Sequence, residues 1–286
     1  MMEALEFGFM QRALLASTII AAVAPLVGSF IVQRRQALIG EGMGHVAFAG
    51  VGLAFLTGLD PLLGALALTL LAAVALVRLS RGSAGGDVSL ALVFYGGLAA
   101  GYLFSARGGG GQNQILSLLF GSPLNLTWGQ VATVAALATA VALALAFLYR
   151  QLVALAFDEA AARASGVPTT GLVMALTVLV ALVVVAGMST IGLLLISAMM
   201  VIPVATAAHI ATSYRATLWL SSAIGAVSAA AGTLVSYHAN VPTGSAIVLT
   251  ALALYIGAAV THAAARYLAR RRHVRPGRPV DLVPDD

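Results

Sequence analysis

The fold is indicated by residues 34–56, which read RRQALIGEGMGHVAFAGVGLAFL. Two arginines precede an apolar run long enough to cross a bilayer, since about 20 apolar residues span the hydrocarbon core as a helix. Similar runs recur at 10–32, 36–57, 61–80, 88–105, 128–149, 169–188, 190–212, 216–236 and 243–265. They are rich in Ala and Leu and do not alternate in polarity, which argues against membrane strands. The sequence predicts an all-α, polytopic membrane protein.

The number of spans is eight or nine. Hydropathy separates 169–188 from 190–212 only by the weak break GMSTIG, so these two runs could also count as one span. The run ILSLLFGSPL at 115–124 is too short to cross and predicts a re-entrant or interfacial helix. We expect one transmembrane domain over 1–268, followed by a polar, disordered tail over 269–286.

The composition excludes several classes of protein. The chain has 286 residues, of which 60% are hydrophobic and 9% charged, whereas a soluble domain is about 25% charged. No length remains for a soluble catalytic domain. Cysteine is absent, which excludes disulfides and thiolate metal sites. All basic residues are arginines, so the chain has no Walker A lysine and any ATP must be bound by another polypeptide. We expect a transport subunit rather than an enzyme.

The arginines indicate the orientation of the chain. Of the 15 arginines, only Arg12 and Arg107 fall on one predicted side, and the other 13 fall on the opposite side. Because cytoplasmic loops carry the excess of positive charge, the side with 13 arginines is expected in the cytoplasm. The N-terminus is then outside and the C-terminus inside, which favours an odd number of spans.

Two ionisable residues lie inside the second predicted span, Glu41 and His45. At a spacing of i, i+4 they share one helix face. If the helix begins near Arg35, they lie about 9 Å and 15 Å along it. A charge in the bilayer costs at least about 2.5 kcal/mol, so such residues face a partner or a substrate path. A carboxylate and an imidazole bind divalent transition metals. A Glu–His hydrogen bond between helices and a proton relay are the alternatives.

Small residues surround this pair. Gly40 and Gly44 form a GxxxG pattern, which allows another helix backbone to approach closely. The pattern is common in membrane helices, but beside two ionisable residues it predicts a tightly packed interface with a narrow polar path.

The stretch LLLISAMMVIPVATAAH at 193–209 contains a proline within an apolar run. Pro203 removes one backbone hydrogen bond, and interrupted helices at membrane depth are tolerated where they line a cavity. Ser197, Met200 and Thr206 are therefore candidate path-lining residues. Ordinary helix packing with a proline kink is the alternative. His209, at the end of this stretch, is expected to be interfacial.

Polar residues also mark the connections between spans. Asp60 and Asp87 each precede a span and are expected to be helix N-caps. The connection 150–168 contains FDEAAARASG, which predicts a short helix. Acidic residues suit its first turn, alanine favours helix, Gly166 can end it and Pro168 can start the next helix.

The chain resembles the membrane subunits of zinc- and manganese-uptake ABC importers, the type 3 ABC permease family. IGEGMGHVAFAGVGLAFL resembles the family's second-span motif, which commonly has Asp where this chain has Glu41 and His at the position of His45. Five further stretches match the family's pattern in the same order: GDVSLALVFYGGLAAG, LLFGSPLNLTW, FDEAAARASGV, LLLISAMMVIPVATA and VPTGSAIVL. The resemblance covers about residues 13–262 and implies a type II ABC-importer-like permease.

The resemblance implies further partners and roles. Two copies of the chain would sit on two ATP-binding subunits, and an extracytoplasmic metal-binding protein would deliver zinc or manganese, with iron also open. No permanently bound cofactor and no nucleic acid are expected. Glu41 and His45 would line the metal path near the dimer axis. The coupling helix that docks on the ATPase would contain Phe157, Asp158, Glu159, Ala160, Arg163 and Gly166. An ion- or proton-coupled secondary metal transporter and a non-transporting membrane scaffold are the alternatives.

Overall fold

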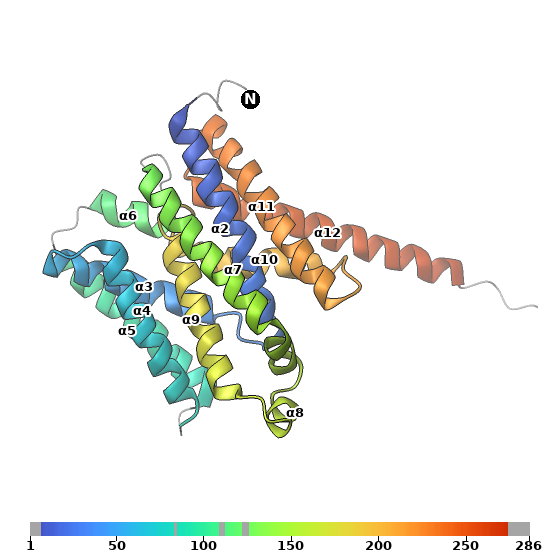
Figure 1. Cartoon of the computed structure of the whole chain (residues 1–286). Helices are drawn as coiled ribbons and strands as arrows, with labels where there is room; N and C mark the ends of the chain where they lie inside the picture. Colours follow the sequence, from blue (N-terminus) through green and yellow to red (C-terminus); the bar gives the residue numbers. More distant parts are fainter. Residues whose placement is uncertain (1–6, 83–84, 109–111, 122–125, 274–286) are drawn as a thin grey trace, which may run out of the picture.

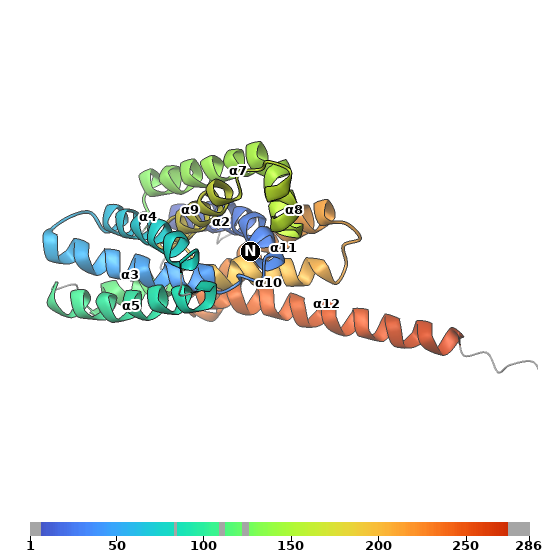
Figure 2. The same ribbon diagram turned by 90° about the horizontal axis from the view of Figure 1, so that it is seen from below.

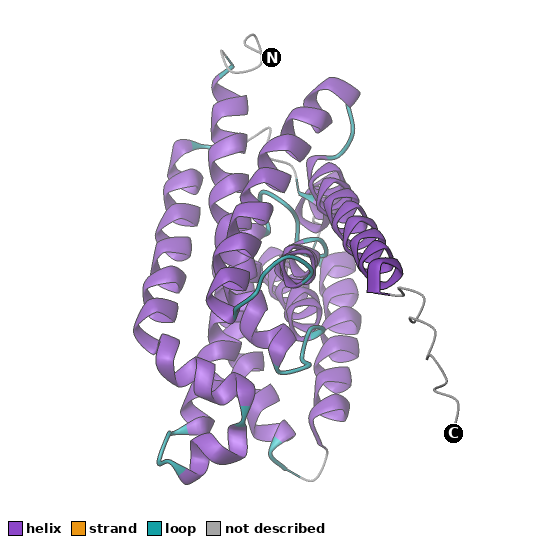
Figure 3. Ribbon diagram, turned by 90° about the vertical axis from the view of Figure 1, so that its right-hand side faces the viewer, coloured by secondary structure: helices purple, strands orange, loops and turns teal. Residues whose placement is uncertain are grey.

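The computed structural model describes residues 7–82, 85–108, 112–121 and 126–273. Within these ranges the chain is built from helices and loops, without a strand (Figures 1 and 3). The helices are α2 (Gly8–Gln33), α3 (Ile39–Thr57), α4 (Pro61–Ser80), α5 (Gly85–Arg107), α6 (Gln112–Phe120), α7 (Trp128–Phe157), α8 (Glu159–Ala164), α9 (Thr169–Gly187), α10 (Ile196–Ala208), α11 (Tyr214–Ala239) and α12 (Thr243–His273).

Eight of the described helices are long and apolar enough to cross a membrane, namely α2, α3, α4, α5, α7, α9, α11 and α12. The all-α polytopic fold is therefore confirmed. The remaining predicted run, 190–212, forms only the 13-residue helix α10, and residues 188–195 before it are irregular. The interruption lies before the helix and not at Pro203, which is inside α10.

The irregular segment keeps its backbone hydrogen bonds. The Leu193 and Leu194 N–H groups donate to the Leu118 and Leu119 carbonyls of α6, at 3.0 and 3.2 Å. Gly192 has φ +102, a conformation that side chains disfavour. The predicted short helix at 115–124 is present as α6, shifted to Gln112–Phe120. Its carbonyl groups accept hydrogen bonds from N–H groups at the break that stops 190–212 from forming one span.

The helices form three neighbouring groups (Figures 1 and 2). Helices α3, α4 and α5 pack together on one side, and α3 packs chiefly on α5 and α4. Helices α2, α7, α9 and α10 form the middle. Helix α11 packs on α2 and α12, and the far half of α12 points away from the rest of the molecule. Helix α8 lies at the end of the molecule opposite to the N-terminus and α6.

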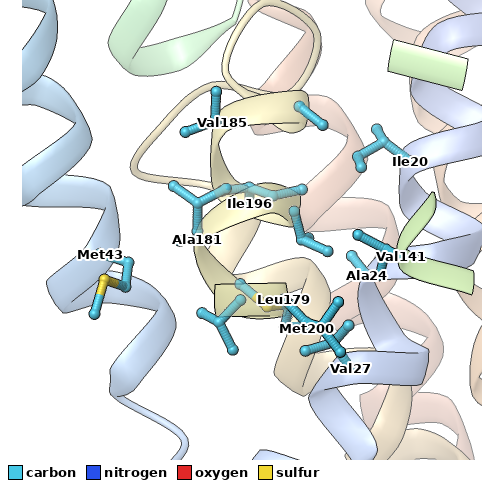
Figure 4. Close-up of a cluster of buried hydrophobic side chains, with 14 of the residues drawn as sticks. Ile20, Ala24, Val27, Met43, Val141, Leu179, Ala181, Val185, Ile196 and Met200 are labelled. Atoms are coloured by element: carbon cyan, nitrogen blue, oxygen red, sulfur yellow. The ribbon is translucent and has the colours of Figure 1, made fainter. Parts of the chain in front are cut away.

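The apolar core lies between α2, α7, α9 and α10 (Figure 4). Its labelled side chains are Ile20, Ala24, Val27, Val141, Leu179, Ala181, Val185, Ile196 and Met200, with Met43 of α3 beside them. Close approach of α2 to α10 depends on Gly28, because a Cβ there would lie 1.8 Å from the Met200 carbonyl oxygen. The core thus fixes the short helix α10 in the middle of the bundle.

Several helix ends differ from prediction. Asp60 is the N-cap of α4 and accepts from the Leu62 and Leu63 N–H groups at 2.8 and 3.2 Å, as expected. Asp87 is not an N-cap, because α5 begins two residues earlier at Gly85. Helix α7 continues to Phe157, well past the predicted span 128–149. Helix α12 continues past the predicted domain end at 268, and residues 274–286 of the predicted tail lie outside the described residues.

Candidate functional site

Glu41 and His45 lie at the start of α3. Because α3 begins at Ile39 and not near Arg35, Glu41 is in the first turn, about 3 Å along the helix, and His45 is about 9 Å along. Both are therefore nearer to the helix end than the sequence predicted. The helix starts late because residues 34–38 form turns, in which Arg35 has a left-handed φ of 58°. Glu41 is half-buried and His45 is 8% exposed.

The His45 ring is held by packing. It lies edge-on to the Phe94 ring of α5, with ring centroids 4.4 Å apart and planes at 71°. Its Nδ1 atom is buried and has no hydrogen-bond partner within the described part of the chain. A buried polar atom left unpaired costs roughly 1–3 kcal/mol. The imidazole therefore has an unused ring nitrogen one helical turn from a carboxylate.

Glu41 borders a cavity of about 300 Å³ between α3 and α5. The lining residues are Leu38, Glu41, Asp87, Leu90, Ala91, Phe94 and Tyr95. Helices α3 and α5 run in the same direction, since Gly42 meets Leu90, Gly97 meets Val46 and Gly52 meets Ser105. Asp87 thus brings a second carboxylate to the cavity. Sequence reasoning assigned it to capping, because the pairing of two helices far apart in sequence was not visible.

The other face of α3 meets α10, as the GxxxG pattern predicted. A Cβ at Gly40 would lie 2.7 Å from the Met200 Cε, and one at Gly44 would lie 2.8 Å from the Leu193 carbonyl oxygen. The irregular segment before α10 therefore brings a backbone carbonyl beside the residue that precedes His45. The sequence offered only the weak break GMSTIG as a signal for this contact.

The four candidate residues of α10 divide into two pairs. Ser197 and Met200 lie beside Gly40 of α3, and Met200 is fully buried. Pro203 and Thr206 lie further along α10, away from its start at Ile196. The Thr206 hydroxyl donates to the Ile202 carbonyl at 2.8 Å, so it serves its own helix. Of these four α10 residues, Ser197 and Met200 are the two that lie beside Gly40 of α3.

The predicted short helix in 150–168 is α8. Asp158 is its N-cap and accepts from the Ala161 N–H at 2.9 Å. Ala160 is exposed on it, and Gly166 follows it with φ +80. Phe157, the last residue of α7, is 60% exposed and lies edge-on to Tyr214 of α11, with centroids 5.4 Å apart. Helix α8 thus presents a small, polar and partly aromatic surface at the end of the bundle.

Three arginines surround the Glu159 carboxylate of α8. Arg34 at the end of α2 and Arg163 of α8 each approach to 2.9 Å, and Arg81 at the end of α4 approaches to 3.8 Å. Arg34 also donates to the Leu155 carbonyl of α7 at 3.1 Å. Sequence reasoning found Glu159 and Arg163 but not the contacts with Arg34 and Arg81. We call these four side chains the Glu159 cluster.

The Glu159 cluster sets the charge state of its carboxyl group. Partial burial acts to raise the pKa of Glu159, but the hydrogen bonds and charges of Arg34 and Arg163 outweigh it, so the pKa lies below its ordinary value. The carboxylate is ionised at neutral pH. It links α8 to the ends of α2 and α4, and Arg34 precedes the turn that leads into α3.

Glu41 and His45 do not make up a complete metal site within the described part of one chain. Among the described residues, no group of three or more His, Cys, Asp or Glu side chains lies close enough to hold an ion. Glu41 and His45 therefore offer at most a pair of ligands, and the Glu159 cluster is a separate feature at the end of the bundle.

Comparison with known proteins gives a consistent result. Residues 6–262 match the model of the ABC 3 transport family. The manganese import system permease protein ScaB of Streptococcus gordonii is 31% identical over 93% of this chain and 96% of its own length. A probable metal transport system membrane protein of Treponema pallidum is 33% identical over 90% of this chain and 97% of its own.

Solved structures show the same fold. The structure described as PsaBC from Streptococcus pneumoniae in complex with Fab aligns with a TM-score of 0.80 and 32% identity, over 88% of this chain and 91% of that one. An inward-facing conformation of a putative metal-chelate type ABC transporter aligns with a TM-score of 0.64 at 19% identity, over 88% and 86%, and at that identity shows the fold alone.

Proposed function

The chain belongs to the ABC 3 transport family, and from this premise we propose that it is the permease subunit of an importer of a divalent transition metal. ATP hydrolysis in a separate subunit drives the transport. Manganese is the leading candidate ion because relatives are named manganese import permeases, and zinc and iron are the other candidates.

The observation that carries the proposal is the pair Glu41 and His45. The pair combines a carboxylate beside a cavity with a buried imidazole whose Nδ1 is unpaired. Carboxylate and imidazole suit manganese, iron and zinc. Ser197 and Met200 flank the path from α10. The ion is held only briefly, because a conducting site must bind weakly enough to release it.

A second copy of the chain completes the site. One chain supplies one carboxylate and one imidazole, and two copies related by a twofold axis supply two of each. Four such ligands satisfy tetrahedral zinc, and with added water they satisfy the larger shell of manganese. The longer reach of Glu41 compared with the family's usual Asp alters the coordination geometry and thereby the choice of ion.

Helix α8 is proposed as the coupling helix that docks on the ATP-binding subunit. The importer contains two copies of that subunit. Ala160 and Arg163 of α8 are exposed, and so is Phe157 at the end of α7 beside it. When ATP binding moves the ATPase subunits, the Glu159 cluster carries the movement of α8 to the ends of α2 and α4. The turn at Arg34 then transmits this movement to α3, which carries Glu41 and His45. An extracytoplasmic metal-binding protein delivers the ion at the opposite end.

The proposed orientation puts α8 in the cytoplasm of a bacterium, with the chain in its inner membrane. Arg34, Arg81 and Arg163 meet at that end, in agreement with the positive-inside rule. In this orientation the N-terminus, which lies at the opposite end of the molecule from α8 in Figure 1, is outside. We place the C-terminus inside, with α10 as a short return between α9 and α11.

A secondary metal transporter is the alternative function. It would use Glu41 and His45 for coupled metal and proton movement. The capped helix α8, which Arg34 and Arg81 connect to the ends of α2 and α4, favours the ABC importer, because a secondary transporter has no partner that would need such a helix.

The test is uptake by proteoliposomes that contain the chain together with its ATP-binding subunit and metal-binding protein. The proposal predicts that manganese or zinc enters only when ATP is supplied, and that the ion stimulates ATP hydrolysis. Uptake driven by a proton gradient without ATP would contradict it and support the secondary transporter.

A further inference from the structure

Two histidines and one tyrosine gather where α10 ends against α12. His209 is the C-cap residue of α10. Its ring lies 5.6 Å from the ring of His262 and 5.5 Å from the ring of Tyr255, centroid to centroid. Tyr255 and His262 are seven residues apart, so they share one face of α12. This cluster is separate from Glu41 and His45 and plays no part in the proposed function.

The spacing of the two imidazoles suits a shared metal ion. With metal–nitrogen bonds of about 2.0–2.1 Å, each ring centre lies about 3.2 Å from the metal, so two ligating rings are at most about 6.4 Å apart. The observed 5.6 Å, with ring planes at 46°, lies inside that limit. His262 is exposed and lies in the last two turns of the candidate span Thr243–Tyr267, and His209 and Tyr255 are half-buried, so other parts of the protein do not enclose the cluster.

The electrostatics of the cluster have two opposing parts. The C-terminal end of a helix carries a partial negative charge, which favours a cation beside His209 at the end of α10. Arg266, one turn beyond His262 on α12, carries a positive charge that opposes it. The cluster is therefore suited to a site of moderate affinity, since an ion with two protein nitrogens fills its remaining positions with water or the Tyr255 hydroxyl.

We infer that His209 and His262 form a second site for a divalent transition metal, facing the side of the membrane on which α10 ends. A bound ion ties α10 to α12. Because α10 begins beside Gly40 of α3 and the segment before it lies beside Gly44, the ion restrains the helix that packs next to the start of α3. Metal binding itself does not depend on the proposed function. The consequence for transport does rest on it: metal accumulated on the cytoplasmic side slows further import.

Binding is tested on the full chain, purified in detergent without a polyhistidine tag. The probe is Cu²⁺, which binds nitrogen and oxygen sites more tightly than the other divalent ions of its row. The background carries Glu41→Ala and His45→Ala, which removes the proposed transport site. Electron paramagnetic resonance is expected to show one copper ion coordinated by two nitrogens. Adding His209→Ala and His262→Ala removes both protein nitrogens, so the two-nitrogen copper signal is expected to disappear.

Two further variants make the test specific. His238→Ala, at the opposite end of α11 from its start at Tyr214, is the matched control and leaves the copper spectrum unchanged. Arg266→Gln is expected to tighten binding, because it removes the opposing charge. Copper binding that is unchanged by the loss of His209 and His262 overturns the inference, provided that thermal unfolding shows an intact fold. The copper-binding assay contains no ATPase. A failure of ATP-driven uptake in the proteoliposome test would therefore contradict the proposed function alone.

Discussion

Single residues on α3 decide whether the candidate path can form. Glycines on one face of α3 allow α10 to approach, and His45 on α3 packs on α5. Gly44 is a tight point near His45, and the neighbouring atom is a backbone carbonyl of the irregular segment before α10. Backbone moves less readily than the end of a side chain, so added volume there displaces the whole segment.

Gly44→Ala is expected to destabilise the protein by about 1–3 kcal/mol, as overpacking does in a filled core. The reason is the Cβ that would lie 2.8 Å from the Leu193 carbonyl oxygen. Thermal unfolding in detergent measures the effect. Gly257→Ala in α12 is the control, since no atom lies within 4 Å of its Cβ, and it should raise stability slightly. Equal unfolding temperatures for both variants would show that α3 and α10 are loosely packed.

Among the elements, α8 is the one whose position depends most on charge. The Glu159 cluster joins it to α2 and α4 through side chains that are partly exposed, with 33% exposure at Glu159 and 10% at Arg34. Solvent screening limits such pairs to about 1 kcal/mol or less each. The Glu159 cluster is therefore a weak ion-pair contact that can rearrange, and not a rigid part of the core.

Glu159→Gln is expected to lower the unfolding temperature at neutral pH, by an amount that disappears in acid. The pKa of Glu159 is lowered in the folded chain, so the carboxylate contributes stability above the pKa of the unfolded chain. That contribution is lost as the pH falls through the lower pKa of the folded chain. Thermal unfolding of wild type and variant from pH 7 to pH 3 checks this.

The matched control for this prediction is Asp158→Asn, which removes a charge on the same helix but keeps an N-cap side chain. The difference in unfolding temperature between wild type and Asp158→Asn should not shrink as the pH falls from 7 to 3. A constant difference between wild type and Glu159→Gln across the pH range would contradict the role given to the Glu159 cluster.

The sequence predicted the elements better than their ends and contacts. Apolar runs predicted eight of the spans, and the signals Asp158 and Gly166 predicted α8. Hydropathy gave only the weak break GMSTIG for the irregular segment 188–195, because Leu193 and Leu194 are apolar and their N–H groups are satisfied by α6, far away in the chain. The contacts of Asp87 with the Glu41 cavity and of Arg34 with Glu159 depend on helix pairing, which residue spacing does not reveal.

On the scale of the whole molecule, the two ends of the bundle differ in character. Helices α2, α4, α7, α8 and α9 meet at the end that carries the Glu159 cluster, and α6 with the start of α12 lies at the other. The proposed transport direction depends on which end faces the cytoplasm.

The orientation can be tested because the chain has no cysteine. Single cysteines at Ala160 of α8 and at Leu59, between α3 and α4 at the opposite end, are both exposed. A membrane-impermeant maleimide applied to intact cells should label Leu59→Cys and should label Ala160→Cys only after the cells are permeabilised. The reverse pattern would invert the proposed topology.

The most direct test of the metal path is ATP-driven uptake of manganese and zinc by the assembled importer with Glu41→Ala or His45→Ala. We predict that each variant still assembles with the ATP-binding subunit, since α8 is unchanged, and that uptake falls at least roughly 10-fold, because losing a ligand costs no less than losing an outer-shell partner of a ligand. Uptake at the wild-type rate by both variants would contradict the assignment of Glu41 and His45 to the metal path.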